Sequence, residues 1–484
     1  MRAHSALPPV RKGKRRLLES CAITAGLIAL AYGGPAMAQV AGAGTITTGG
    51  AGGSIVDSAN KTTVSITTNE AIVDWTPSGT PTDGVIDFLP FGNTLEFRGG
   101  LGGYTVLNRF VSGTGTPISD TIALSGTVQS YRTAAGVPDT QGGNIWFYNA
   151  GGILINARAA INVSSLVLTT NDIDTAGGLA PGGTIRFRGA PNSNATVTVA
   201  NNAFIGADNG VAGGSYVALV APRVVQNGIA NVNGSAAYVA AEVADITINA
   251  ANGLFDINVT TGANGGNVIT HGGVTTGPEQ TGTLAHRIYM VAIPKNDAVT
   301  MLVSGQVGYD DASSATVSNG SIVLSAGYNV TSGAMNDVPA NNGAANISVN
   351  DIIFLSDVTA HASNDFLGQP LGVVPTGGPF TVLPPAWQGR FSIQGNGTFV
   401  GENSATLTIN AGRQSIITGD LLVQANGTAA GPGSATINVD GGGLVALGNI
   451  NLLATGTPIG ATGIGQGGNA TLNVLNGGQM GAGL

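Results

Sequence analysis

The amino-acid sequence predicts an all-β protein folded as a parallel β-helix. Glycine supplies 77 of the 484 residues and charged residues only 9%, which disfavours helices because glycine costs roughly 1 kcal/mol per helical position and the residues that usually fill exposed helix faces are scarce. Short alternating apolar runs, separated by Gly, Asn, Asp and Ser, are typical of strands and turns. Similar segments recur at loose intervals, as the coils of a solenoid do. A 43% apolar composition argues against intrinsic disorder.

Residues 1–38 are predicted to be a cleaved export signal. A basic stretch from Arg11 to Arg16 precedes the apolar run Cys21–Tyr32, and Ala36 and Ala38 supply the small side chains of a cleavage site. The apolar run has twelve residues, which is shorter than the ~20 that a membrane-spanning helix needs. We therefore expect the segment to be removed during export.

The mature chain is acidic and has no cysteine. Without residues 1–38 it keeps 12 Lys and Arg against 25 Asp and Glu, a formal net charge of −13, and the only cysteine, Cys21, lies in the predicted signal. Binding of nucleic acid needs clustered Lys and Arg, so we expect no nucleic-acid partner. A chain without disulfides can pass through a narrow pore unfolded, although a large solenoid that needs no disulfides explains the same composition equally well.

Repeated segments support the solenoid. Ser215–Ala221 is repeated 22 residues later as Ala237–Val243. Gly-Gly-Asn tripeptides precede predicted strands at Gly142, Gly265 and Gly467. Three segments share the pattern Ala-Thr-apolar-polar-apolar at spacings of 30 and 35 residues: Ala405–Ile409, Ala435–Val439 and Ala470–Val474. We predict roughly 22 residues per coil and about 20 coils.

We divide the mature chain into an N-terminal β-helix domain, residues 39–295, and further β-helix repeats, residues 296–484. A proline-rich stretch at 370–387 interrupts the repeats, and proline cannot donate to a sheet ladder. We expect a loop there, either a contact surface that carries Phe380 and Trp387 or a tolerated insertion. The last repeat stops without a polar cap, so the C-terminus is read as either the natural end or a truncation.

Seven segments of the N-terminal domain follow one another in the order and spacing of a known family: Ala71–Trp75, Asn93–Phe97, Val106–Phe110, Leu124–Val128, Asn144–Ile155, Val217–Val224 and Asn227–Ile229. With these segments, residues 39 to about 250 resemble the N-terminal two-partner secretion domain of filamentous haemagglutinin-like exoproteins.

The resemblance implies a right-handed β-helix with a capped N-terminal secretion domain that also nucleates folding. It implies an adhesin-like exoprotein that passes through the periplasm of a Gram-negative bacterium and is secreted or displayed on the cell surface. The implied partners are an outer-membrane β-barrel transporter and, as adhesion targets, host or cell-surface glycans or proteins.

The resemblance also assigns secretion recognition to six residues on two segments: Leu107, Asn108, Arg109, Asn149, Gly151 and Gly152. The family usually has Asn-Pro-Asn-Gly where this chain has Asn-Ala-Gly-Gly at 149–152. Loss of the proline removes a fixed φ from the turn. The variant turn leaves two possibilities open: a divergent branch with its own transporter, or another export route that uses the same cap.

Two other functions remain open. Parallel β-helices also include enzymes that cleave acidic polysaccharides with carboxylates and arginines from neighbouring coils. The carboxylate pairs and arginines available for such chemistry are Asp172 with Asp174, Asp310 with Asp311, and Arg186 with Arg188. Solvated turns explain these side chains equally well, and we expect no enzyme. The other alternative is an autotransporter passenger, although the chain ends without the ~10-residue alternating strands of a terminal barrel.

We expect neither a cofactor nor a metal site. The mature histidines, His271, His286 and His361, are 15 and 75 residues apart, which does not fit the close spacing of a helical metal site. They are read as isolated surface or hydrogen-bonded histidines.

Overall fold

The computed structural model describes residues 40–48, 53–211, 213–248, 254–278, 286–309, 320–336, 340–341, 343–370, 390–428, 431–456 and 467–483. Ala38–Leu484 forms one compact unit. The predicted signal with Ala36 and Ala38, almost all of the proline-rich stretch and the pair Asp310 and Asp311 lie outside the described residues. In the described part, regular structure is β-strand apart from one 3-10 turn, Pro181–Gly183.

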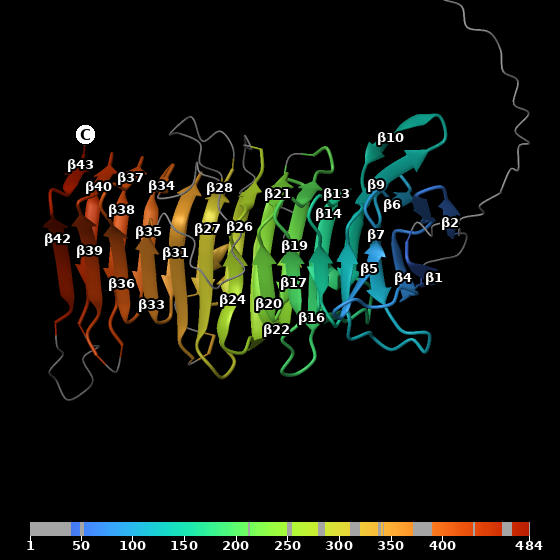
Figure 1. Ribbon diagram of the computed structural model, residues 1–484, viewed down its shortest axis with the longest axis horizontal. Helices are drawn as coiled ribbons and strands as arrows, with labels where there is room; N and C mark the ends of the chain where they lie inside the picture. The colour runs from blue at the N-terminus through green and yellow to red at the C-terminus, as the bar shows by residue number, and fades with distance from the viewer. Residues whose placement is uncertain are drawn as a thin grey trace, which may run out of the picture. The chain divides into compact units, whose positions relative to one another are not determined.

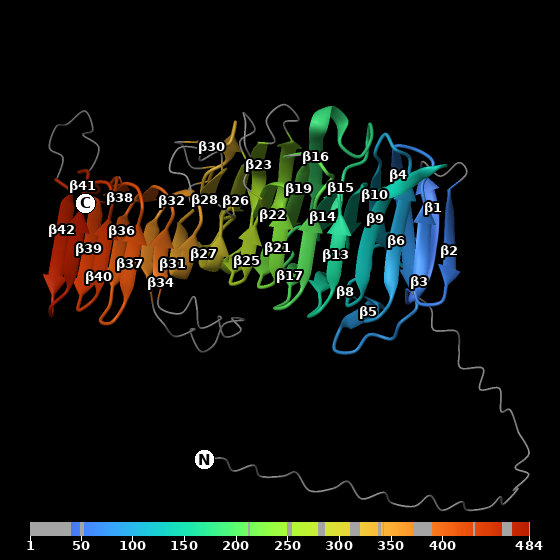
Figure 2. The ribbon, with the colours of Figure 1, turned by 90° about the horizontal axis from the view of Figure 1, so that it is seen from above.

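Parallel strands stack into three ladders, which confirms the predicted parallel β-helix (Figures 1 and 2). Each coil contributes a strand to each ladder, so successive turns of the chain pair through backbone hydrogen bonds. The right-handed sense of the helix stays a prediction.

The first ladder consists of β4 (Glu70–Pro77), β7 (Thr105–Phe110), β11 (Asn144–Tyr148), β14 (Ser165–Thr169), β19 (Ser215–Ala221), β22 (Gly234–Ile248), β26 (His286–Ala292), β28 (Gly320–Ala326), β32 (Asp357–Ala362), β35 (Gly397–Gly401), β38 (Leu421–Ala425) and β41 (Ile450–Ala454).

The second ladder consists of β5 (Val85–Leu89), β8 (Thr121–Leu124), β12 (Ile153–Ile155), β17 (Thr196–Val199), β20 (Arg223–Gln226), β24 (Gly266–His271), β27 (Val299–Val307), β31 (Ala345–Phe354), β33 (Asp365–Gln369), β36 (Ser404–Ile409), β39 (Ser434–Asp440) and β42 (Asn469–Leu475).

The third ladder consists of β3 (Lys61–Ser65), β6 (Thr94–Gly99), β9 (Thr127–Ala134), β13 (Ala160–Val163), β18 (Phe204–Ala207), β21 (Ile229–Val232), β25 (Val274–Thr276), the second halves of β27 and β31, β34 (Arg390–Ile393), β37 (Gln414–Ile417), β40 (Gly443–Ala446) and β43 (Gln479–Ala482).

Two of the sequence repeats differ in how well they match the coils. The C-terminal repeats are confirmed, because Ala405 pairs with Ala435 and Ala435 with Ala470. The 22-residue repeat does not match the pairing of the strands. It aligns Ala237 with Ser215, whereas in the structure Ala237 pairs with Ala218, three residues further along. An odd shift reverses the face of every side chain in a strand, so Tyr238 points into the helix whereas Tyr216 packs outside it.

The predicted number of coils is also wrong. Among the described residues, the first ladder has twelve strands rather than about twenty rungs. Coils are longer than the predicted average because several carry insertions. One insertion adds strands between β14 and β19, and another lengthens the path from β22 to β26.

The inserted strands form an antiparallel sheet outside the helix, which we call the lateral sheet. It consists of β15 (Asp172–Ile173), β16 (Thr184–Arg188), the second half of β22, β23 (Phe255–Gly262), β29 (Val330–Thr331) and β30 (Ala334–Met335). A second apolar cluster lies between this sheet and the outer face of the first ladder, where Phe187 and Phe255 pack with residues such as Trp146. The first ladder is therefore buried on both faces over these coils.

Antiparallel strands close the N-terminal end of the ladders. β1 (Gly42–Thr48) pairs with β4, and β2 (Ser54–Ser58) pairs with β3. A further hairpin joins β9 to β10 (Val137–Gln141) and projects from the coils (Figure 1). Beyond this end the parallel pairing continues without a break from β24 to β27 and from β26 to β28, so the domain boundary at residue 295 stays a prediction.

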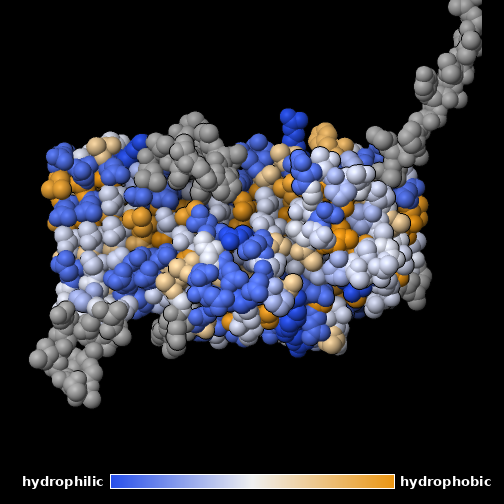
Figure 3. All heavy atoms as spheres, turned by 60° about the horizontal axis from the view of Figure 1, so that its bottom comes forward, coloured by the Kyte–Doolittle hydropathy of each residue, from blue (hydrophilic) through white to orange (hydrophobic). Residues whose placement is uncertain are grey.

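Hydrophilic and hydrophobic side chains are interspersed on the surface that Figure 3 shows. Apolar side chains gather instead inside the helix, where inward positions of successive strands stack at the strand spacing of ~4.8 Å. Ile437 of β39, for example, pairs with Leu407 on one side and Leu472 on the other, and Leu407 and Ile437 have no exposed surface.

Candidate functional site

The predicted recognition residues of β7 face three different surroundings. Leu107 is fully buried in the cluster beneath the lateral sheet. Asn108 points into the helix, where it accepts a hydrogen bond from Trp75 Nε1 at 2.9 Å and donates to the carbonyl oxygen of Trp146 at 3.1 Å. Its amide therefore connects strands of three consecutive coils, β4, β7 and β11.

Arg109 is half-buried, whereas the other two are fully buried. Its guanidinium donates two hydrogen bonds to the carboxylate of Asp74, at 2.7 and 2.9 Å. Hydrogen bonds from Arg109 to Asp74 raise the pKa of the guanidinium further above its usual range. This bidentate pair links β7 to β4 on the outer face of the first ladder.

The second predicted segment forms a tight corner after β11. Gly152 N donates to the carbonyl oxygen of Asn149 at 3.2 Å, and Asn149 Nδ2 donates to the carbonyl oxygens of Gly152 at 2.7 Å and Asp120 at 2.8 Å. Gly152 has a φ of +129°. A Cβ on Gly151 would lie 2.2 Å from the carbonyl oxygen of Ser119, so this corner accepts no larger residue without a shift of the backbone.

The structure brings the two predicted segments onto neighbouring coils. β7 and β11 are parallel partners, and Arg109 pairs with Tyr148, the residue immediately before Asn149. Leu107, Asn108 and Asn149 have no exposed surface. In the folded protein most of this site is therefore closed to a partner.

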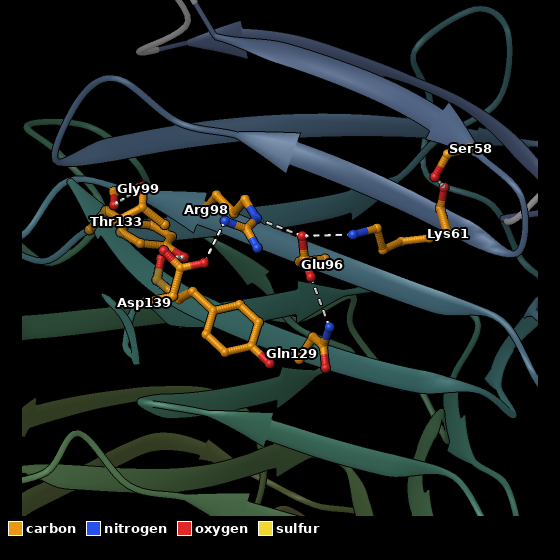
Figure 4. Close-up of polar contacts among 10 residues, drawn as sticks. Ser58, Lys61, Glu96, Arg98, Gly99, Gln129, Thr133 and Asp139 are labelled. Carbon is orange, nitrogen blue, oxygen red and sulfur yellow. Dashed lines mark hydrogen bonds and ion pairs between the residues drawn. The ribbon is translucent and has the colours of Figure 1, made fainter. Parts of the chain in front are cut away.

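Figure 4 shows a charged cluster around Glu96 of the third ladder that was not predicted from the sequence. Glu96 is buried and accepts hydrogen bonds from Lys61 Nζ at 3.2 Å, Arg98 Nε at 2.6 Å and Gln129 Nε2 at 2.9 Å. Arg98 also bonds Asp139 of β10 at 2.7 Å. The residues lie on β3, β6, β9 and β10, so the cluster connects the first coils to the projecting hairpin.

Burial alone would raise the pKa of Glu96, but the hydrogen bonds from Arg98, Gln129 and Lys61 outweigh it and hold the pKa below its ordinary value. Glu96 is therefore ionised at neutral pH. One sequence signal was available, because Glu96 and Arg98 are two residues apart in a strand and so share one face.

Of the carboxylates considered for catalysis, the structure describes Asp172 and Asp174, and their surroundings differ. Asp172 lies opposite Arg188 in the backbone pairing of the lateral sheet. The Arg188 side chain forms an ion pair with Asp245, at 2.6 Å. Burial raises the pKa of Asp172. Asp174 instead accepts a hydrogen bond from the backbone of its own turn. In the described ranges, no three His, Cys, Asp or Glu side chains are placed to hold a metal ion.

The three histidines of residues 39–484 have different surroundings. His271 is buried in the helix and hydrogen-bonded on both ring nitrogens. His286 is also buried, and neither ring nitrogen has a hydrogen-bond partner among the described residues. His361 Nε2 contacts Glu402 at 2.7 Å, and its ring stacks on Tyr328 with centroids 4.2 Å apart.

A groove of about 430 Å³ lies beside the β9–β10 hairpin. Leu101 and Val211 line it with exposed side chains, and Arg132 bonds the carbonyl oxygen of Asn209 at 2.6 Å across it. This contact fixes the base of the hairpin against the loop that follows β18.

Two secretion domains are among the solved structures that this chain resembles in fold. No family model and no curated protein matches the chain. The chain is similar to the HMW1 secretion domain from Haemophilus influenzae, with 16% sequence identity and a TM-score of 0.34 over 90% of this chain and 99% of that one. It is also similar to a filamentous hemagglutinin secretion domain, with 14% identity and a TM-score of 0.28 over 90% of this chain and 98% of that one. Within the described residues, no helix is long and apolar enough to span a membrane.

Proposed function

We propose that this protein is an adhesin-like exoprotein, secreted or displayed on the surface of a Gram-negative bacterium. Residues 1–38 direct it into the periplasm. Residues 39–295 are the secretion domain that an outer-membrane β-barrel transporter recognises, and residues 296–484 add coils that extend the binding surface. The adhesion target is a glycan or protein on another cell.

One observation carries the proposed recognition step. Folding hides most of the residues that the resemblance assigns to recognition: Leu107, Asn108 and Asn149 have no exposed surface. A transporter that reads these side chains must therefore read them before the coils form. This favours recognition of an extended chain in the periplasm.

The same residues suit a folding nucleus. Asn108 connects three coils through Trp75 and Trp146, and the Asn149 corner fixes the path between the first two ladders. Coils that form outside the cell add to these first coils, and each new coil buries apolar surface worth ~25 cal/mol per Å². Stacking on the exterior would bias transit outward without an energy source at the outer membrane.

Export of two matched asparagine variants tests this function. Asn149 and Asn171 are both fully buried and both donate side-chain hydrogen bonds to backbone carbonyls, but only Asn149 belongs to the recognition segments. We expect Asn149→Ala and Asn171→Ala to lose similar stability, about 1–3 kcal/mol. Only Asn149→Ala should also reduce the amount of protein in the medium, in cells that co-express its outer-membrane transporter.

Equal losses of export in the two variants would show that stability, and not recognition, limits secretion. If wild-type protein lost residues 1–38 but stayed in the cell envelope, the proposed function itself would be contradicted. Urea unfolding of the two purified variants supplies the comparison of stability.

A further inference from the structure

The outer face of the second ladder carries a regular array of uncharged polar side chains in its last coils. We call it the Thr/Asn face and define it by two rows that run across β36, β39 and β42: Thr406, Thr436 and Thr471 in one row, and Thr408, Asn438 and Asn473 in the other. All six side chains are half-buried at outward positions, and their inward neighbours are apolar. The pairing across these three strands has no register shift.

Hydrogen bonds hold one of these rows in place. Asn473 Nδ2 donates to Asn438 Oδ1 at 2.8 Å, and Asn438 Nδ2 donates to Thr408 Oγ1 at 3.4 Å. Threonine is β-branched and has few rotamers, so the other row is also restricted. A ligand that binds here would lose little additional side-chain entropy on the protein side.

The composition of the face and its surroundings disfavours acidic polymers and proteins as partners. From Asn403 to the end of the chain the sequence has three charged residues: Arg413, Asp420 and Asp440. An acidic polymer would find few cations to pair with. The six side chains also include none of the Trp, Tyr and Arg that anchor protein interfaces.

We propose that the Thr/Asn face binds a neutral, linear polysaccharide that lies along the stacking direction of the coils. The strands present equivalent hydroxyl and amide groups every ~4.8 Å along the stack, and the two rows are ~6.7 Å apart along each strand. A linear homopolysaccharide also repeats its hydroxyl groups at a fixed interval, so many weak hydrogen bonds form together along the array. This inference deepens the proposed adhesin function and rests on it, because it names the class of target.

Binding of the purified mature chain to insoluble polysaccharides tests the inference. Cellulose and a 1,3-β-glucan serve as neutral probes and calcium alginate as an acidic one. We expect retention on a neutral probe that does not change with salt concentration, because no ion pairs are involved. The double variant Thr406→Val and Thr436→Val removes two hydroxyls but keeps side-chain shape, and should bind about tenfold more weakly.

The matched control is the double variant Thr359→Val and Thr398→Val. These two threonines also point outward and pair with each other, but on the first ladder. This control variant should be retained on the neutral polysaccharides as strongly as the wild type. Circular dichroism and the melting temperature show whether each variant folds.

Three results would overturn the inference: no retention on either neutral probe, equal loss in the control variant, or retention only on alginate with strong dependence on salt. Export is measured separately. Normal export without retention would therefore reject the Thr/Asn face and leave the proposed secretion function standing.

Discussion

A chain of polar side chains crosses the apolar interior near the middle of the helix. Tyr238 OH lies 2.7 Å from Thr275 Oγ1, which lies 2.9 Å from His271 Nε2, and His271 Nδ1 donates to the carbonyl oxygen of Ser304 at 2.8 Å. This arrangement satisfies a neutral imidazole, with the Thr275 hydroxyl donating to Nε2. Burial lowers the pKa of His271 to about 4.

The depressed pKa of His271 predicts a loss of stability in mild acid. The pKa of an unfolded histidine is about 6.5, so between pH 6.5 and 4 the unfolded chain binds a proton that the folded protein does not. Stability should therefore fall as the pH decreases through this window, by about 3 kcal/mol in total from this group. His286 acts in the same direction, because burial lowers its pKa too.

Urea unfolding at several pH values measures this effect in the wild type and in His271→Gln, whose amide can keep both hydrogen bonds. The variant should show a shallower dependence on pH, since only His286 and the remaining groups titrate. If the free energy of unfolding fell equally with decreasing pH in both proteins, His271 would not be the group responsible.

The corner at Gly151 gives a second prediction at the residue scale. Gly151→Ala places a methyl group against the carbonyl oxygen of Ser119, whereas the Cβ of Gly102→Ala meets no heavy atom within 4 Å. We expect Gly151→Ala to cost about 1–3 kcal/mol and Gly102→Ala to change stability by less than about 0.5 kcal/mol. Thermal unfolding of both variants checks this, and equal melting temperatures would show that the corner tolerates a side chain.

At the scale of elements, the charged cluster around Glu96 holds the β9–β10 hairpin. Arg98 joins the buried Glu96 to Asp139 and lies over the ring of Tyr131, 5.6 Å from its centroid. About a third of the Arg98 side chain is exposed, so solvent screening reduces the contribution of these ion pairs.

We predict that Arg98→Met destabilises the hairpin by about 1 kcal/mol. Hydrogen exchange at residues 127–141 should become several-fold faster, because Glu96 keeps only Lys61 and Gln129 as partners. The exposed Arg390→Met serves as the control and should not alter exchange in the hairpin. Unchanged protection in Arg98→Met would mean that backbone pairing alone holds the element.

The sequence predicted some elements and could not predict others, for physical reasons. The last repeats were predictable because Ala405, Ala435 and Ala470 are the second residues of strands whose inward residues must stack. The repeat at 215 and 237 was misaligned, since two alternating apolar strands match equally well in several registers. Strands such as β16 and β23 look like any other strand, and only their distant partners in β22 place them in the lateral sheet.

The candidate site was also only partly predictable from the sequence. Its residues were named through the family resemblance, and their burial could not be predicted because it depends on the lateral sheet and on neighbouring coils. The Glu96 cluster brings together residues from four strands, and only the Glu96 and Arg98 spacing was visible in the sequence.

At the scale of the whole molecule, the stacked ladders link folding to the proposed export. Each coil is stabilised by its neighbours, so coils can be added in sequence once the first ones exist. A coil that is already stacked and cross-linked is too wide for a pore that accepts an extended chain. Residues 39–484 contain no cysteine, so a disulfide can be introduced without a competing partner.

The most direct test is therefore export of a variant with Leu154→Cys and Thr198→Cys, which are paired positions of β12 and β17. The variant is first accumulated in the periplasm without the transporter and oxidised there, and the transporter is then induced. We predict that the cross-linked protein stays in the periplasm, that reduction releases it, and that each single-cysteine variant is exported normally. Cross-linked protein that reaches the medium at the wild-type yield would contradict export of an unfolded chain.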